Sequence, residues 1–162
     1  MALTLQQQQT LKTYILSVPE LAAQPMNSDG ADAIATAIRQ PAVPAFTVWK
    51  TNVSVDEIMR NGMNWTLVDG ITVGKARIWE WMSRLGTIDV SKLNIRAGID
   101  EAWKGIGTDM VTQRANIYTH CKRDATITEK LFATGTGTVA SPATMGFEGS
   151  LSWQDVEAAR AV

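Results

Sequence analysis

Apolar positions in the first third of the chain recur at the spacing of an α-helix, which predicts short helices separated by prolines. The first is expected over residues 4–17, which include four consecutive glutamines, with Pro19 setting its end. A second is expected over Asn27–Ile38, where Asn27 or the serine after it can serve as the N-cap. Ser54, three residues before a glutamate, has capping-box spacing and predicts a short helix over residues 55–61.

The segment 72–85 is predicted to be a helix that is apolar on more than one side. Trp79 is expected to face away from a stripe of apolar side chains that share one face: Ile78, Trp81, Met82 and Leu85. Two interpretations are compatible with this pattern. The helix can be packed by neighbours on two sides, or one of its tryptophans can belong to a subunit interface, because aromatic residues are enriched in interface cores.

Two longer helices and one short one are expected in the next part of the chain. Ser91 is predicted to cap a helix that ends near Trp103 and buries a stripe of Ile95, Ile99, Ala102 and Trp103. Another helix is expected to begin at Thr108 or Asp109 and to continue to Cys121. A short helical turn is expected over residues 128–133.

After residue 133 the composition changes, because threonine, glycine and proline dominate residues 134–149. Such residues disfavour helix and suit extended strands joined by turns, so a β-hairpin or a protruding arm is predicted. Ser152, with Asp155 three positions later, then begins a short C-terminal helix. The predicted fold is therefore mainly α: a bundle of four to five helices over residues 1–133, then a β arm and terminal helix over 134–162. Such an arm has few apolar contacts of its own and would be ordered best by another subunit.

Composition narrows the classes of function. The chain has 162 residues, 45% of them hydrophobic, with 15 Lys and Arg against 16 Asp and Glu and a formal net charge of -1. This balance gives no electrostatic reason to expect a protein that coats DNA. No apolar run is long enough to span a bilayer, so neither membrane insertion nor secretion is expected.

No residue pattern points to catalysis, a cofactor or a metal. The T-G-T-G-T run at residues 134–138 lacks the features of a phosphate-binding loop. The single histidine, His120, and the single cysteine, Cys121, are adjacent, so on a helix they point about 100° apart and cannot easily act as base and nucleophile. Asp100 and Glu101 are expected to lie on a solvated helix face.

Four cations on the middle helices are expected to make ordinary surface pairs, with contacts to acidic partner residues or to a DNA backbone as the alternative: Lys75, Arg77, Arg84 and Arg96. The chain also has six tryptophans, which is more than a core of this size readily absorbs. Because tryptophan anchors both cores and interfaces, this number favours assembly over catalysis.

Several strings of the sequence resemble small virion-associated proteins of tailed bacteriophages. They are V-G-K-A-R-I-W-E-W-M at 73–82, I-R-A-G-I-D at 95–100, H-C-K-R at 120–123, E-K-L-F-A-T-G-T-G at 129–137 and S-P-A-T-M-G-F-E-G at 141–149. Among such proteins the layout is similar to the helical head-to-tail adaptors, which form rings under the portal vertex.

This resemblance implies a non-enzymatic connector subunit located in the virion at the head–tail interface and made in the host cytoplasm. Its partners would be further copies of itself in a ring of twelve, the portal protein, and a stopper or tail protein, and DNA would pass without sequence-specific binding. The segment from Leu131 to Val162 would reach the portal or a neighbouring subunit. The candidate interface residues are Trp79, Trp81, Trp103, Leu131, Phe132, Met145, Phe147 and Trp153.

Two alternatives remain open at this stage. One is another virion component, such as a tail-completion, terminator or capsid-decorating protein. The other is a cytosolic enzyme or regulator made during infection.

Overall fold

The computed structural model describes residues 3–105 and 107–162, and the chain is mainly helical, as predicted. It forms two compact units: unit 1 contains residues 1–48 and 124–162, and unit 2 contains Trp49–Arg123. Strands β1 (Thr47–Trp49) and β4 (Lys122–Asp124) carry the chain out of unit 1 and back, and they pair in a two-stranded sheet. The division predicted at residue 133 does not coincide with these units.

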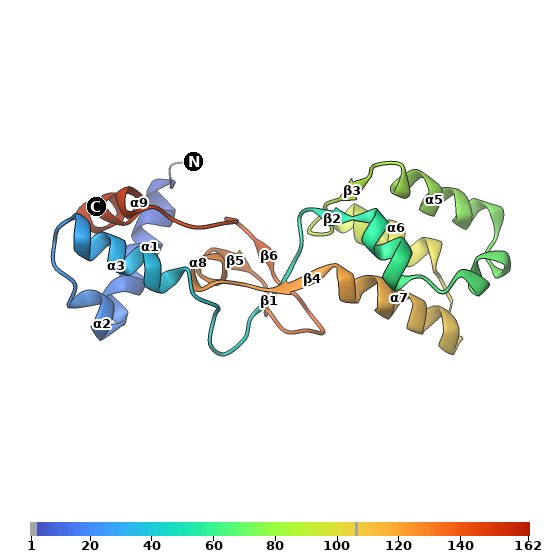
Figure 1. The fold of residues 1–162 in the computed structure, drawn as a ribbon, viewed down its shortest axis with the longest axis horizontal. Helices are drawn as coiled ribbons and strands as arrows, with labels where there is room; N and C mark the ends of the chain where they lie inside the picture. Colours follow the sequence, from blue (N-terminus) through green and yellow to red (C-terminus); the bar gives the residue numbers. More distant parts are fainter. Residues whose placement is uncertain (1–2, 106) are drawn as a thin grey trace. The chain divides into compact units, whose positions relative to one another are not determined.

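Unit 1 combines both ends of the chain (Figure 1). Its elements are α1 (Leu5–Ser17), α2 (Pro19–Ala22), α3 (Ser28–Ile38), α8 (Ile127–Leu131), β5 (Ala133–Thr134), β6 (Thr144–Met145) and α9 (Trp153–Ala161). The predicted caps are present: the Asn27 side chain accepts a hydrogen bond from the backbone of α3, and Ser152 forms a capping box with Asp155 at the start of α9. These bonds satisfy N–H groups that a helix start leaves without partners.

The C-terminal helix α9 packs against α1 and α3 (Figure 1). Leu151, Val156 and Ala159 are buried there with apolar residues from the N-terminal helices, among them Leu11, Ile15, Ile34, Ala35 and Ile38. The terminal segment was expected to be an arm that another subunit orders. In the structure it completes the core of unit 1, because its apolar stripe is buried within the chain.

The predicted hairpin is formed by β5 and β6, with Ala133 opposite Met145. Two glycines of the connecting segment, Gly135 and Gly137, have positive φ angles of 127° and 67°, which residues with side chains rarely adopt. A Cβ atom on Gly137 would lie 2.1 Å from the ring of Phe46. The glycines therefore provide both the turn and the close approach to Phe46.

Unit 2 consists of short strands and helices around one core. Its elements are β2 (Val53–Ser54), α4 (Val55–Glu57), the π-helical turn η1 (Ile58–Gly62), the 3₁₀ segment η2 (Trp65–Gly70), α5 (Val73–Ser83), β3 (Thr87–Ile88), α6 (Leu93–Ala102) and α7 (Thr108–His120). The helix predicted over 55–61 corresponds to α4 and η1, and Ser54 caps it. Ser91 does not cap α6 as expected: its hydroxyl lies 2.5 Å from the carboxylate of Asp89, and α6 begins two residues later.

The core of unit 2 is built by α5, α6 and α7 together with β2, α4, η1 and β3. The predicted stripe on α6 is present, since Ile99, Ala102 and Trp103 are buried and Ile95 is partly buried against them. Ile117 and Cys121 from the end of α7 belong to the same cluster.

On α5 the structure corrects the predicted assignment of faces. Trp79 and Met82 are buried, whereas Trp81 and Leu85 are 65% and 60% exposed. Residues three apart on a helix are separated by only about 60°, so Trp79 and Met82 share the core face. Trp81 lies on the opposite side and remains in solvent.

Candidate interaction surface

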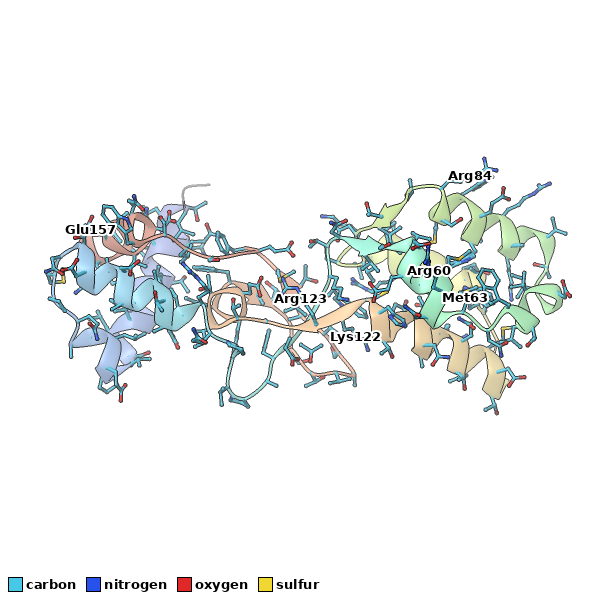
Figure 2. The ribbon with its side chains drawn as sticks, in the orientation of Figure 1. Arg60, Met63, Arg84, Lys122, Arg123 and Glu157 are labelled. Carbon is cyan, nitrogen blue, oxygen red and sulfur yellow. The ribbon has the colours of Figure 1, made fainter. Side chains whose placement is uncertain are left out.

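The outer face of α5 presents apolar and cationic side chains together. Val73, Trp81 and Leu85 are exposed there at four-residue spacing, with Arg77 completing the row. Residues four apart lie above one another on a helix, so Val73, Arg77 and Trp81 form a continuous row, and Leu85 follows in the turn after the helix. Arg84, which follows the last turn, is also exposed, and Figure 2 shows it at the outer edge of unit 2. We call these five residues the α5 outer face.

Positive charge exceeds negative charge around the α5 outer face. Glu80 forms an ion pair with Arg84, and the ammonium of Lys75 donates a hydrogen bond to the carbonyl oxygen of Lys104 at 2.7 Å. Arg77 is exposed. Lys75, Arg77 and Arg84 thus outnumber the one carboxylate of this segment, Glu80. Arg84 forms an ordinary surface ion pair, as expected.

The inner face of α5 shows why the other two tryptophans of this region are not on the surface. The rings of Trp79 and Trp103 meet edge to face, with centroids 5.9 Å apart. The Trp79 indole nitrogen lies 3.4 Å from the sulfur of Met59. Of the three tryptophans of unit 2 that were predicted to lie in an interface, Trp79 and Trp103 are buried and Trp81 is exposed. Trp65 on η2 is 55% exposed, although it was not among the predicted interface residues.

A cationic and aromatic cluster surrounds Trp49. The guanidinium carbon of Arg96 lies 5.0 Å from the ring centroid, and the ammonium of Lys122 lies 5.4 Å from it. The ring of Tyr118 packs beside the indole at 5.4 Å. Arg96 also donates to the carbonyl oxygens of Val90 and Ser91, at 2.6 and 2.8 Å. This arginine therefore has a structural role as well as a cation–π contact.

Asp100 is engaged in a contact that sequence reasoning missed. Its carboxylate is exposed on α6, as expected, and it also accepts a hydrogen bond from the hydroxyl of Tyr118 at 2.9 Å. Burial of the tyrosine, and then this bond, raise the pKa of Tyr118 well above its usual value. Glu101 behaves as expected and forms an exposed ion pair with Lys104.

His120 and Cys121 point to different surroundings. The Nδ1 atom of His120 lies 3.3 Å from a carboxylate oxygen of Glu57 on α4. Cys121 is buried, and its thiol lies 3.2 Å from the carbonyl oxygen of Ile117. Burial raises the pKa of Cys121 to about 12, so its thiol stays protonated at neutral pH. The geometry gives this cysteine a role in packing.

Gln113 links α7 to the segment after η1, although no sequence signal singled it out. The side chain is buried, and its amide nitrogen donates to the carbonyl oxygen of Gly62 at 2.7 Å. Its amide oxygen accepts from the backbone nitrogen of Asn64 at 2.7 Å. A glutamine normally favours the surface, so its burial is explained by these two bonds to backbone groups.

The interface candidates of unit 1 make contacts within their own unit. Phe132 and Phe147 meet edge to face with ring centroids 5.8 Å apart, and both are partly buried. Met145 packs against the small cluster around Val48. Trp153 is 38% exposed at the start of α9. Partly exposed Leu131 lines a groove of about 340 Å³ with five other residues: Tyr14, Ala42, Val43, Ile127 and Lys130.

Within residues 3–105 and 107–162, no group of three or more His, Cys, Asp or Glu side chains could hold a metal ion. None of the helices in this part of the chain has the length and apolarity required to cross a membrane. Comparisons of the chain with protein-family models, curated proteins and solved structures find no match.

Proposed function

We propose that this protein is a non-enzymatic structural subunit that acts by assembly, and specifically a head-to-tail connector subunit of a tailed bacteriophage. The observation that carries the assembly part is the α5 outer face. An exposed indole in a row with two exposed aliphatic side chains and an arginine has the composition of an interface core. The connector part rests on the resemblance of the sequence strings to virion proteins.

The remaining chemistry of the described residues supports the same proposal. Cys121 is protonated and buried, and the Gln113, Asp100 and Arg96 side chains bind groups of their own unit. These polar groups stabilise the fold. A connector of this kind would have the portal protein and a stopper or tail protein as partners, in a ring of twelve copies through which DNA passes.

The test is the copy number of this chain in purified particles of the phage that encodes it. Quantitative mass spectrometry would give the ratio of the chain to the portal protein in the same particles. A ratio near one is expected for a connector ring. A ratio of tens would contradict the connector and indicate a capsid-decorating or tail-tube protein, and absence from the particle would contradict every virion function.

A further inference from the structure

The two units carry opposite formal charges. Unit 2 has eleven Lys and Arg and eight Asp and Glu, which gives a net charge of +3. Unit 1 has four Lys and Arg and eight Asp and Glu, which gives -4. The net charge of the whole chain is close to zero because the opposite net charges of the two units nearly cancel.

Three of the eight carboxylates of unit 1 lie in one segment near its N-terminus. Residues 19–38, which contain α2 and α3, include Glu20, Asp29 and Asp32 and no Lys or Arg, and the exposed Arg39 follows directly as the C-cap of α3. All three carboxylates are exposed, and Met26 between the two helices is 77% exposed. We call residues 19–38 the acidic segment.

Two cations adjoin the acidic segment: Arg39 at the C-cap of α3 and Arg160 of α9. The guanidinium of Arg160 donates to the carbonyl oxygens of Gln24 and Pro25, at 2.8 and 2.9 Å. Arg160 is half-buried, whereas the three carboxylates are exposed. Three exposed carboxylates thus outnumber the one exposed cation beside them, Arg39, so the net charge of this surface is negative.

We infer that the α5 outer face of one copy binds the acidic segment of a second copy of this chain. The two surfaces are complementary in charge, since Arg77 and Arg84 on one stand against Asp29 and Asp32 on the other. They also share apolar character, because Trp81 and Met26 are both largely exposed. Charge complementarity guides two surfaces into register, while burial of the apolar groups supplies the attraction between them.

The two surfaces differ, so the contact is head to tail. In such a contact each copy uses one surface to bind the copy ahead and the other to bind the copy behind. The association continues beyond a dimer until it closes in a ring or extends as a filament. This inference rests on the proposed assembly function and names its partner as a further copy of the same chain.

Sedimentation velocity of the purified full-length chain tests the inference. Species larger than the monomer are expected to form as the protein concentration rises and to dissociate as NaCl is added, because salt screens exposed charges. The double variant Arg77→Glu, Arg84→Glu is expected to lose these species. Arg60→Glu is the matched control, since Arg60 is an exposed arginine of the same unit, with 75% of its side chain accessible against 71% for Arg84.

A second variant alters the other surface. Asp29→Asn combined with Asp32→Lys changes the formal charge at positions 29 and 32 from -2 to +1 and brings the acidic segment from -3 to 0. It also keeps a cation away from the first turn of α3, where it would oppose the helix dipole. Alone, this variant is also expected to be monomeric. Mixed in equal amounts with Arg77→Glu, Arg84→Glu, it is expected to restore assembly, because positions 29 and 32 then have a formal charge of +1 and positions 77 and 84 of the other variant have -2.

Circular dichroism would verify that both variants keep the helical signal of the wild type. If a charge variant fails to fold, Trp81→Ser provides a second test and is expected to weaken assembly without changing the spectrum. Assembly of Arg77→Glu, Arg84→Glu equal to that of Arg60→Glu would overturn the inference, as would a wild type that stays monomeric in low salt. A mixture that does not reassemble would overturn the pairing of these two surfaces. The particle copy number is measured independently, so a connector could be confirmed while this contact is rejected.

Discussion

The indole rings of Trp79 on α5 and Trp103 after α6 pack edge to face, with centroids 5.9 Å apart and an angle of 74° between their planes. Both side chains are buried, and they join two helices that contact each other directly. Trp81 is only two residues from Trp79 and lies in solvent. Of these two tryptophans on α5, Trp79 therefore belongs to the core and Trp81 to the surface.

Replacement of these tryptophans should separate stability from assembly. Trp103→Ala is expected to lower the free energy of unfolding by about 3–5 kcal/mol, because it removes a large buried side chain and leaves a cavity. Trp81→Ala is expected to change it by no more than about 0.5 kcal/mol, as is usual for surface positions. Urea unfolding at a protein concentration where the chain is monomeric would measure both. Equal losses of stability would contradict the assignment of faces on α5.

Gln113→Ala is expected to destabilise unit 2 by roughly 1–3 kcal/mol, because the carbonyl of Gly62 and the amide of Asn64 would be left without their partner. Thr112→Ala, at an exposed neighbouring position of α7, is the matched control. Thermal unfolding of the two variants provides the comparison. A Gln113→Ala variant as stable as the control would show that water replaces both bonds.

Glu129→Ala should destabilise unit 1 in a similar way. One carboxylate oxygen of this buried residue accepts from the backbone nitrogen of Thr126 at 3.0 Å, and the other accepts from that of Gly149 at 3.2 Å. Loss of the carboxylate removes the capping box of α8 and a link to the segment before α9. We expect a cost of roughly 1–3 kcal/mol in chemical denaturation. Glu157→Ala, on the exposed side of α9 (Figure 2), should be nearly neutral.

Stability is expected to fall as the pH rises from about 9 towards 12, and Cys121 is one cause. Burial raises the pKa of its thiol from 9.0 to about 12, so above pH 9 the unfolded chain loses a proton that the folded chain retains. The unfolded state is then favoured by the increase in pH. Cys121→Ala should flatten this dependence in denaturation curves measured across the window. Tyr118, whose pKa is also raised, contributes in the same direction and should leave a residual slope.

Deletion of residues 151–162 is expected to open the core of unit 1, because it removes Leu151, Val156 and Ala159 from between α1 and α3. Hydrogen exchange should then increase in α1 and α3, while α5, α6 and α7 keep the protection of the full-length chain. Unchanged exchange in α1 and α3 would contradict the packing of α9. A loss of particle incorporation in such a truncation would therefore reflect unfolding of unit 1, and single exposed substitutions are better probes of docking.

Local patterns in the sequence predicted the helical class, the hairpin and most helix starts. The caps at Asn27, Ser54 and Ser152 were predictable because each involves groups only three residues apart, so the sequence contains the whole interaction. The extended character of residues 134–149 followed from their threonines and glycines in the same way. The six tryptophans indicated large buried or interfacial areas without saying which side chain faces which way.

Only the tertiary structure decided how these elements are grouped and which residues stay exposed. Gln113 and Gly62 are 51 positions apart, and Arg160 and Pro25 are 135 apart, so no local pattern could place them together. The outward direction of Trp81 depends on α6 packing against the other side of α5. The opposite net charges of the two units follow from the sequence, but they can be assigned only once the structure groups residues 1–48 with 124–162. Where a helix starts depends mainly on residues close in the sequence, whereas which of its side chains are exposed depends on the elements that pack against it.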